Sequence, residues 1–220
     1  MKVSEFQQRQ ALDQIAEIKR ILAAAIHGMN NQVPGSILIT SAEQEEGKSL
    51  VAAALAASAA RSGDTRVAIL DANWFRPALH RFFNLDTYLP MRQLFEGELQ
   101  QLVRPIQDSS LDILTAPSDY STNATSADRI NLTIKRIIEQ AKNSYGLTII
   151  DSGALFPTNR FMVDPVMMSS IVTGVILVVK SGSTARHQVK KAIKIMETTG
   201  AKVLGVVSNH WQLPVGGTGQ

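Results

Sequence analysis

Short runs of consecutive apolar residues alternate along the chain with longer segments in which apolar residues recur every three or four positions. The runs lie at 36–40, 67–71, 111–114, 147–151, 174–179 and 203–207. Several are apolar throughout, which is typical of strands covered on both faces. The segments 49–61, 127–143 and 184–199 between them have the spacing of helices. This alternation predicts an α/β, three-layer fold with a mainly parallel central sheet flanked by helices.

Ahead of the first run, residues 3–29 predict a further helix with an apolar stripe that includes Ile18, Leu22 and Ile26. The ordinary interpretation is a helix that packs on the sheet, and the alternative is an interface through which copies of the chain self-associate. The segments 84–90 and 117–126 are polar or interrupted by Pro and are interpreted as surface loops, and the end at about 213–220 as a flexible tail. We expect a single domain over residues 1–220.

Composition narrows the class of protein. The 220 residues, 45% hydrophobic and 19% charged, fit one globular domain. The 22 basic and 19 acidic residues give no reason to expect nucleic acid, and the basic run at 186–194 is interpreted as a solvated helix face. The absence of cysteine excludes disulfides, thiolate metal sites and cysteine nucleophiles.

Membrane and export signals are also missing from the sequence. No apolar stretch approaches the roughly 18 residues of a spanning helix, and the N-terminal segment is too polar for a signal peptide. We therefore expect a cytoplasmic protein that a partner recruits to the inner face of the membrane.

The strongest chemical signal is Gly47-Lys48-Ser49, which directly follows the first predicted strand and opens a helix of small residues. This is the context of a P-loop. Backbone N–H groups at such a helix start face the phosphates of a nucleotide, and a lysine ammonium reaches the outer ones. The Ser49 hydroxyl then meets Mg²⁺. The sequence predicts ATP or ADP, with Mg²⁺, as the ligand.

Two carboxylates stand at related places. Asp71 ends the second predicted strand and Asp151 ends the run at 147–151. In open α/β sheets ligands bind beyond the carboxyl ends of the strands, so both carboxylates are expected near the phosphate site. For either Asp alone, a cap residue at the start of a loop is the alternative interpretation.

With these motifs in place, the chain resembles the cytoplasmic domain of the bacterial tyrosine kinases (BY-kinases), relatives of the MinD/ParA ATPases that assist capsule and exopolysaccharide export. The resemblance runs from about residue 11 to residue 209. It rests on the P-loop, on the segment 69–80, which resembles the family's Walker A′ strand, on the Walker B strand ending at Asp151, and on the segment 200–209. It implies a P-loop NTPase fold, tyrosine kinase activity, and a membrane polysaccharide co-polymerase of the chain-length determinant type as partner.

The resemblance also implies roles for individual residues. The catalytic residues are Lys48, Asp71 and Asp151; the nucleotide-binding residues are Glu46, Gly47, Lys48, Ser49, Leu50 and Asn209, with Asn209 at the adenine; the Mg²⁺ ligands are Ser49, Asp71 and Asp151. Asp71 is the candidate base for the acceptor hydroxyl.

The P-loop itself departs from the family pattern. Gln44 and Glu45 replace a usual Pro-Gly. If Glu45 needs a positive φ, a non-glycine residue there costs about 1 kcal/mol or more. The loop also carries three carboxylates, from Glu43, Glu45 and Glu46, although Glu46 matches a family Glu. Repulsion of a polyphosphate is small if Glu43 and Glu45 point to solvent.

Further departures concern the machinery of the kinase. Asn73 replaces the second acid of the Walker A′ strand, and Ala23 replaces the last Arg of a helical Glu-x-x-Arg-x-x-Arg motif that mediates ring assembly in the family. No tyrosine follows Asn209, so the family's tail-to-neighbour phosphorylation cannot run on this chain; its tyrosines are Tyr88, Tyr120 and Tyr145.

Three functions remain open from the sequence. The first is an ATP-binding BY-kinase relative in exopolysaccharide or capsule synthesis or export, with tyrosine kinase activity weak or lost. The second is a non-catalytic pseudokinase that serves as a binding or regulatory subunit of the export complex. The third, a positioning ATPase like MinD/ParA, is disfavoured because Glu43 stands where that branch has a signature lysine.

Overall fold

The computed structural model describes residues 5–87, 89–120, 126–156 and 162–210. Its centre is a seven-stranded sheet in the order β3-β4-β2-β5-β1-β6-β7. The strands are β1 (Gly35–Ser41), β2 (Val67–Asp71), β3 (Arg104–Pro105), β4 (Leu111–Leu114), β5 (Leu147–Ala154), β6 (Gly174–Lys180) and β7 (Val203–Asn209). Every neighbouring pair is parallel except the short edge pair β3–β4. The mainly parallel sheet expected from the sequence is therefore confirmed.

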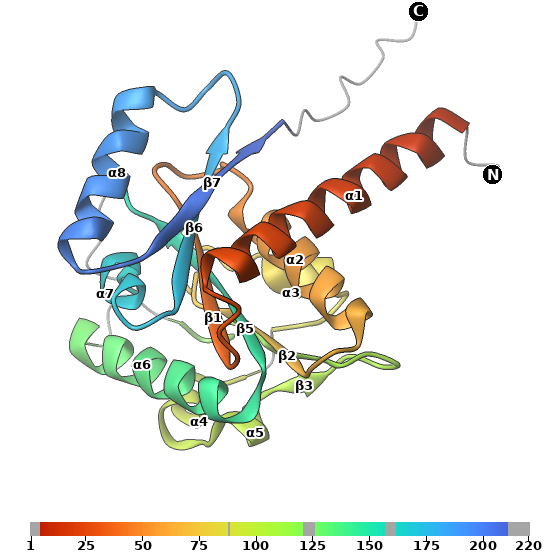
Figure 1. The fold of residues 1–220 in the computed structure, drawn as a ribbon. Coiled ribbons are helices and arrows are strands. Elements are labelled where there is room, and N and C mark those ends of the chain that lie inside the picture. Colours follow the sequence, from red (N-terminus) through yellow and green to blue (C-terminus); the bar gives the residue numbers. More distant parts are fainter. Residues whose placement is uncertain (1–4, 88, 121–125, 157–161, 211–220) are drawn as a thin grey trace, which may run out of the picture.

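Helices cover both faces of the sheet (Figure 1). One face carries α1 (Glu5–Gly28), α2 (Lys48–Ser62) and α3 (Leu79–Phe82). The other carries α4 (Met91–Glu96), α5 (Leu99–Leu102), α6 (Ala127–Ser144), α7 (Pro165–Ser169) and α8 (Arg186–Thr198). This is the three-layer arrangement predicted above.

Side-chain alternation along the strands explains the two-sided core. Ile37 and Ile39 of β1 pack against α1 and α2, whereas Leu38 between them packs on the opposite face, and all three are fully buried. Since successive side chains of a strand point to opposite faces, a strand covered on both sides must be apolar at every position. The continuous apolar runs in the sequence follow from this geometry.

Helix starts are fixed by local hydrogen bonds. The Ser126 hydroxyl accepts the backbone N–H of Arg129 and caps α6, and the Asp164 carboxylate accepts the N–H of Val166 at 2.8 Å and caps α7, with Pro165 in its first turn. Such caps satisfy backbone donors that the helix itself leaves unpaired.

The predicted elements agree with the structure except for the shortest ones. All six predicted strands are present, with bounds extended by up to three residues. The elements α3, α4, α5, α7 and β3 were not predicted, because two to six residues are too few to show a helical or strand period. The described residues of the segment 84–90 form a loop, but Leu89 is buried in the core rather than lying on the surface. Residues 121–125 of the other predicted loop and the tail at 213–220 lie outside the described residues.

The N-terminal helix packs on the sheet by its C-terminal half. Leu22 and Ala25 of α1, followed by Met29, are buried against α2 and the sheet, while the N-terminal end of α1 extends past the body of the molecule (Figure 1). Glu17 and Arg20 form an exposed pair at 4.0 Å on this helix. No helix in the described ranges combines the length and apolarity needed to cross a membrane.

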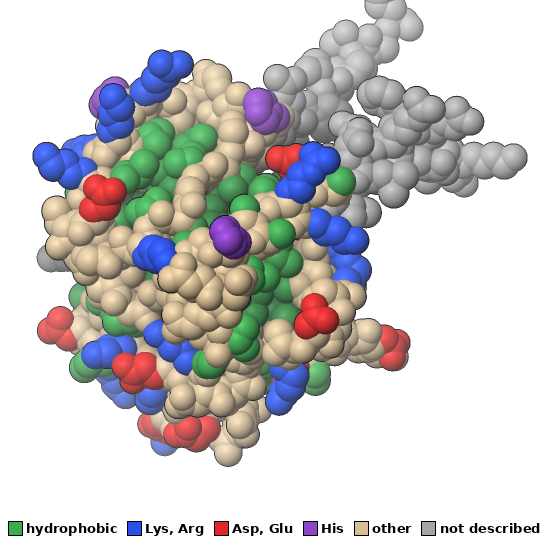
Figure 2. Space-filling model, in the orientation of Figure 1, with side chains coloured by type: hydrophobic (Ala, Val, Ile, Leu, Met, Phe, Trp, Pro, Cys, Tyr) green, Lys and Arg blue, Asp and Glu red, His purple; other side chains and the backbone are tan. Residues whose placement is uncertain are grey.

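Basic side chains gather on the solvent face of α8, as Figure 2 shows at the upper left. They are exposed, and none forms an ion pair with another described residue: Arg186, Lys190, Lys191 and Lys194. The opposite face of α8 buries Ala192 and Met196. The helix is therefore amphipathic, which agrees with the interpretation of the run as a solvated face.

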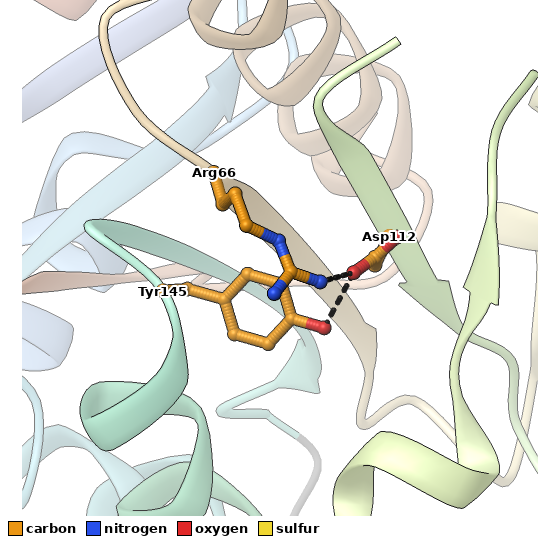
Figure 3. Close-up of polar contacts among 3 residues, drawn as sticks. All are labelled: Arg66, Asp112 and Tyr145. Carbon is orange, nitrogen blue, oxygen red and sulfur yellow. Dashed lines mark hydrogen bonds and ion pairs between the residues drawn. The ribbon is translucent and has the colours of Figure 1, made fainter. Parts of the chain in front are cut away.

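A polar cluster of two buried residues and an exposed arginine lies at the amino edge of the sheet (Figure 3). The Asp112 carboxylate of β4 accepts a hydrogen bond from the Tyr145 hydroxyl at 2.7 Å and pairs with the Arg66 guanidinium at 2.6 Å, both through Oδ2. Arg66 also lies over the Tyr145 ring at 5.0 Å. Burial and the hydrogen bond to Asp112 raise the pKa of Tyr145 well above its ordinary value. The cluster joins the starts of β2, β4 and β5.

Replacing Tyr145→Phe removes one of the two donors to the buried Asp112 carboxylate. We expect the free energy of unfolding to fall by about 1–3 kcal/mol, because an under-satisfied buried acceptor keeps its desolvation cost. Chemical denaturation measures the change. Because the cluster lies at the edge opposite the candidate site, nucleotide affinity should stay unchanged; stability equal to the wild type would contradict this account.

Candidate functional site

A pocket of about 470 Å³ opens at the carboxyl edge of the sheet. Its size lies in the usual range for small-molecule sites. It is lined by residues of the loops after β1, β2 and β5, of the ends of β5, β6 and β7, of the start of α2 and of α3: Gln44, Glu45, Gly47, Lys48, Ser49, Leu50, Asn73, Phe75, Arg76, Ala78, Phe82, Gly153, Ala154, Met162, Lys180 and Asn209. Four of the predicted nucleotide-binding residues in the P-loop thus share one pocket with Asn209, which is distant in sequence.

Glycine is required at position 47 for two reasons. Gly47 precedes α2 with φ 88°, in the left-handed region. The Asn209 side chain donates from Nδ2 to the Glu46 carbonyl at 3.1 Å, and a Cβ at position 47 would lie only 2.0 Å from this Nδ2. The Asn209 amide at the end of β7 therefore supports the P-loop, and only a glycine at position 47 leaves room for it.

Glu46 anchors the loop rather than facing the pocket. Its buried carboxylate accepts the backbone N–H of Glu43 at 2.7 Å through Oε2. Through Oε1 it accepts the N–H of Lys180 at 3.4 Å and the hydroxyl of Thr184. The loop after β1 and the loop that leads into α8 are consequently joined by one side chain, and Glu46 is not among the pocket-lining residues.

Lys48 is a buried cation that lines the pocket. Burial lowers the pKa of its ammonium, and the nearby carboxylates of Asp151 and Glu46 oppose that shift. No described carboxylate lies within ion-pair distance of Lys48. A cation with little hydration and no close counter-ion attracts an anionic ligand.

Asp151, fully buried in the C-terminal half of β5, has no hydrogen-bond partner of good geometry at either carboxylate oxygen among the described residues. Burial raises the pKa of Asp151 to about 7, while the Ser49 hydroxyl and the Lys48 ammonium lower it. Buried acceptors without a hydrogen bond are rare in proteins, and such groups usually bind a water molecule or an ion.

These donors fit Mg²⁺. The described residues hold no group of three or more His, Cys, Asp or Glu side chains that could bind a metal by themselves. Mg²⁺ in nucleotide sites needs no such group, because it takes one or two protein oxygens and completes its shell with phosphates and water. The free oxygens of Asp151 and the hydroxyl of Ser49 supply that kind of partial set.

Asp71 lies beside Asp151 in the register of β2 and β5. Its carboxylate accepts the backbone N–H groups of Asn73 at 3.0 Å and Leu79 at 3.4 Å, and it is fully buried outside the pocket lining. Burial and the neighbouring Asp151 raise the pKa of Asp71 well above its ordinary value. In this structure Asp71 shapes the loop after β2, as a cap residue does.

The loop after β2 presents other side chains to the pocket. Trp74 is buried, donates from Nε1 to the Asp71 carbonyl at 2.8 Å and meets the Tyr120 ring edge-on. Asn73 and Phe75 line the pocket instead. Of the two adjacent aromatic residues, one therefore belongs to the core and the other to the site.

The structure resolves the question left open at Glu45. Its φ is 62°, so a non-glycine residue occupies the left-handed region within the P-loop. Its carboxylate is 85% exposed and stands 3.6 Å from the Arg76 guanidinium. The expected backbone cost is therefore present, and the Glu45 charge is largely in solvent.

Sequence reasoning missed several lining residues: Arg76 as a pocket group, Ala78, Phe82, Met162 and Lys180. Lys180 ends β6 at the same edge as Asp71 and Asp151, so the rule that ligands bind beyond the strand ends could have found it. The side chain of Phe82 comes from a four-residue helix that has no sequence period to reveal it.

The comparisons with known proteins agree with this geometry. Tyrosine-protein kinase YwqD of Bacillus subtilis is 28% identical over 186 residues, covering 81% of this chain and 73% of the relative. Tyrosine-protein kinase ptk of Acinetobacter johnsonii is 30% identical over 208 residues, covering 91% of this chain but only 27% of that longer protein. Succinoglycan biosynthesis transport protein ExoP of Rhizobium meliloti is 29% identical over 179 residues, or 79% of this chain and 22% of the relative. No model of a known protein family matches the chain.

Solved structures give the same answer for the fold. The chimerical protein CapA2B2 is similar with 26% identity and a TM-score of 0.68, over 87% of this chain and 82% of its own. The VpsO kinase domain reaches a TM-score of 0.78 at 21% identity, over 95% and 100%. MinD of Pyrococcus horikoshii, solved with Mg-ADP, has a TM-score of 0.65 at 18% identity, over 80% and 70%. The P-loop NTPase fold and the resemblance to bacterial tyrosine kinases are thereby confirmed.

Two glycines at the ends of α2 separate backbone strain from the contact with Asn209. Gly47 and Gly63 both have positive φ, but a Cβ at Gly63 would meet nothing within 4 Å. We expect Gly63→Ala to cost about 1 kcal/mol of unfolding free energy, and Gly47→Ala to cost clearly more, about 2 kcal/mol or above, because Asn209 must also move. Equal losses in denaturant titrations would show that Asn209 does not constrain the loop.

The raised pKa of Asp151 makes stability depend on pH. Because the folded chain keeps this carboxyl protonated to about pH 7, it binds more protons than the unfolded chain between about pH 4 and 7, and the free energy of unfolding falls as the pH rises through that range. Asp151→Asn should flatten this slope in the nucleotide-free protein. Thermal unfolding from pH 5 to 8 tests it, and parallel profiles for the two proteins would disprove the assignment.

Proposed function

We propose that this chain binds ATP or ADP with Mg²⁺ in the pocket at the carboxyl edge of its sheet. The observation that supports this best is Asp151, a buried carboxylate with no hydrogen-bond partner of good geometry among the described residues, beside the buried cation Lys48 at the start of α2. The desolvation cost of each buried group is offset when an anion lies near Lys48 and a cation near Asp151. A metal-bound polyphosphate supplies both ions.

In this proposal the residues share the work as follows. The backbone at Gly47 and the first turn of α2 faces the phosphates, and the Lys48 ammonium neutralises the outer ones. Ser49 and Asp151 hold Mg²⁺, which spreads the negative charge of the phosphates. Asn209 contacts the nucleotide at the end of β7, and Leu50 continues the binding loop into the helix.

In this proposal Asp71 mainly has a structural role. Its carboxylate already accepts two backbone N–H groups, which fixes the loop that carries Asn73, Phe75 and Arg76. It is also fully buried and outside the pocket lining, so it is poorly placed to act as the base for an attacking hydroxyl or as a ligand of Mg²⁺. Nucleotide binding with weak phosphotransfer is consistent with that placement.

For the cellular role we propose synthesis or export of exopolysaccharide or capsule, with a membrane co-polymerase of the chain-length determinant type as partner at the inner face of the membrane. Support comes from the names of the relatives, which include tyrosine-protein kinases and a succinoglycan biosynthesis transport protein. Self-association through α1 belongs to the same proposal.

A second candidate is a non-catalytic subunit of the export complex. Asn73 faces the pocket where the family has an acid, so no second carboxylate is offered there. Tyr145 is buried and bonded to Asp112, which excludes it as an acceptor in the folded chain. These observations weaken the kinase and leave the binding site intact.

Calorimetric titration with ATP and ADP in the presence of Mg²⁺ tests the proposal. We expect saturable binding by the wild-type chain and at least a 100-fold loss in Lys48→Ala, since one charge-assisted contact to phosphate in a water-poor site contributes about 3 kcal/mol. Asp151→Asn should remove the Mg²⁺ dependence. Tyr145→Phe serves as the control for unrelated loss of stability.

No binding at millimolar nucleotide would overturn the proposal. If binding is present, incubation with ATP and an acceptor tyrosine peptide separates the two candidates. Phosphotyrosine that disappears in Lys48→Ala supports a weak kinase, and nucleotide binding without any phosphotyrosine supports the non-catalytic subunit.

A further inference from the structure

An ion pair joins two loops across the candidate nucleotide pocket. Glu45 belongs to the loop after β1 and Arg76 to the loop after β2, and both line the pocket that holds Lys48 and Ser49. The Arg76 Nη1 atom lies 3.6 Å from the Glu45 Oε1 atom, with side chains 58% and 85% exposed. The pair is thus open to solvent and forms part of the pocket lining.

The backbone directs Glu45 to this place. Its φ of 62° turns the residue into the left-handed region. The residues on both sides are fixed, because the Glu46 carboxylate accepts the N–H of Glu43 and the Ser41 hydroxyl donates to the Glu43 carbonyl. The loop therefore holds the backbone of Glu45, and from there the exposed carboxylate reaches Arg76.

Hydrogen bonds in the loop after β2 also fix the backbone of Arg76. The Asp71 carboxylate holds the backbone N–H of Asn73, and the N–H of Arg76 itself donates to the Asn73 carbonyl at 3.1 Å. The buried Trp74 ring, bonded to the Asp71 carbonyl, closes the same turn. The backbone of Arg76 is therefore fixed in this turn, whereas its exposed side chain can change its partner.

The energetics favour an exchange of partners. An exposed ion pair contributes less than about 1 kcal/mol, so it breaks readily. A polyphosphate in the pocket carries several negative charges and accepts the planar guanidinium fork through two oxygens, which a single carboxylate at 3.6 Å does less well. The same polyphosphate repels the Glu45 carboxylate.

We propose that Glu45 sets the nucleotide affinity of this chain by holding Arg76, and that Arg76 leaves Glu45 for a phosphate when nucleotide binds. This inference rests on the proposed nucleotide site. It assigns Glu45 an affinity-lowering role and Arg76 a phosphate-binding role. Every nucleotide must then break the pair before it gains the arginine.

The test is a double-mutant cycle on Mg-ATP affinity, measured by calorimetry. Glu45→Gln removes the charge and keeps the size of the side chain, and we expect it to tighten binding about 2- to 5-fold. Arg76→Ala should weaken binding in both backgrounds, but by a larger factor in Glu45→Gln, where no pair has to be broken first. Adding salt should shrink all of these factors.

Two controls separate the ion pair from other causes. Glu45→Gly removes the backbone strain as well as the charge, so affinity that rises in Glu45→Gly but not in Glu45→Gln would overturn the role of the charge. Glu96 and Arg92 form a similar exposed pair on α4 at 3.3 Å, outside the residues that line the pocket. Glu96→Gln changes the net charge equally and should leave nucleotide affinity unaltered.

The outcomes distinguish this inference from the proposed function. Wild-type affinity in Glu45→Gln, or an equal effect of Arg76→Ala in both backgrounds, disproves the exchange while nucleotide binding itself stands. Absence of binding in the wild type and in every variant disproves the nucleotide site and the exchange with it. Tighter binding in Glu45→Gln together with the larger arginine effect supports the inference.

Discussion

Charge buried inside a protein must find compensation, because the hydration that it loses is worth more than any single hydrogen bond returns. This chain buries three carboxylates in its sheet and treats each differently. Asp112 is satisfied by Arg66 and Tyr145 and Asp71 by backbone N–H groups, whereas neither oxygen of Asp151 has a hydrogen bond of good geometry within the described chain. The first two are explained by the fold alone. The third, Asp151, lies beside the pocket, where a bound ligand would supply the interactions that the protein does not.

The P-loop reaches its shape through protein contacts of its own. Glu46 joins it to the loop before α8, Asn209 supports it from β7, and two left-handed residues, Glu45 and Gly47, flank Glu46. A loop held in this way needs little reorganisation to receive a phosphate, which is the general advantage of a preorganised site. It also explains why a glutamate is tolerated at position 45: the surrounding contacts over-determine the backbone there and offset the local strain.

The sequence predicted the parts of the molecule that repeat a period or a motif. The strands were visible because a sheet covered on both faces needs apolar residues at every position, as Ile37, Leu38 and Ile39 illustrate. Gly47, Lys48 and Ser49 were visible because their spacing has a mechanism. Pocket residues such as Phe82 and Lys180 were not, since their place depends on how distant loops converge. The bonding of Asp71 was equally hidden, because the same residue at a strand end serves as a ligand or as a cap.

The contact between Gly47 and Asn209 has a consequence for how such sequences can drift. One position lies at the end of the P-loop, directly before α2, and the other at the end of the last strand, yet the amide of Asn209 fills the space that a side chain at position 47 would need. Neither residue can change alone without loss. Descendants of this chain are therefore expected to keep both residues or to exchange both, so the two positions should vary together in lineages where the pocket is still used and separately where it has been abandoned.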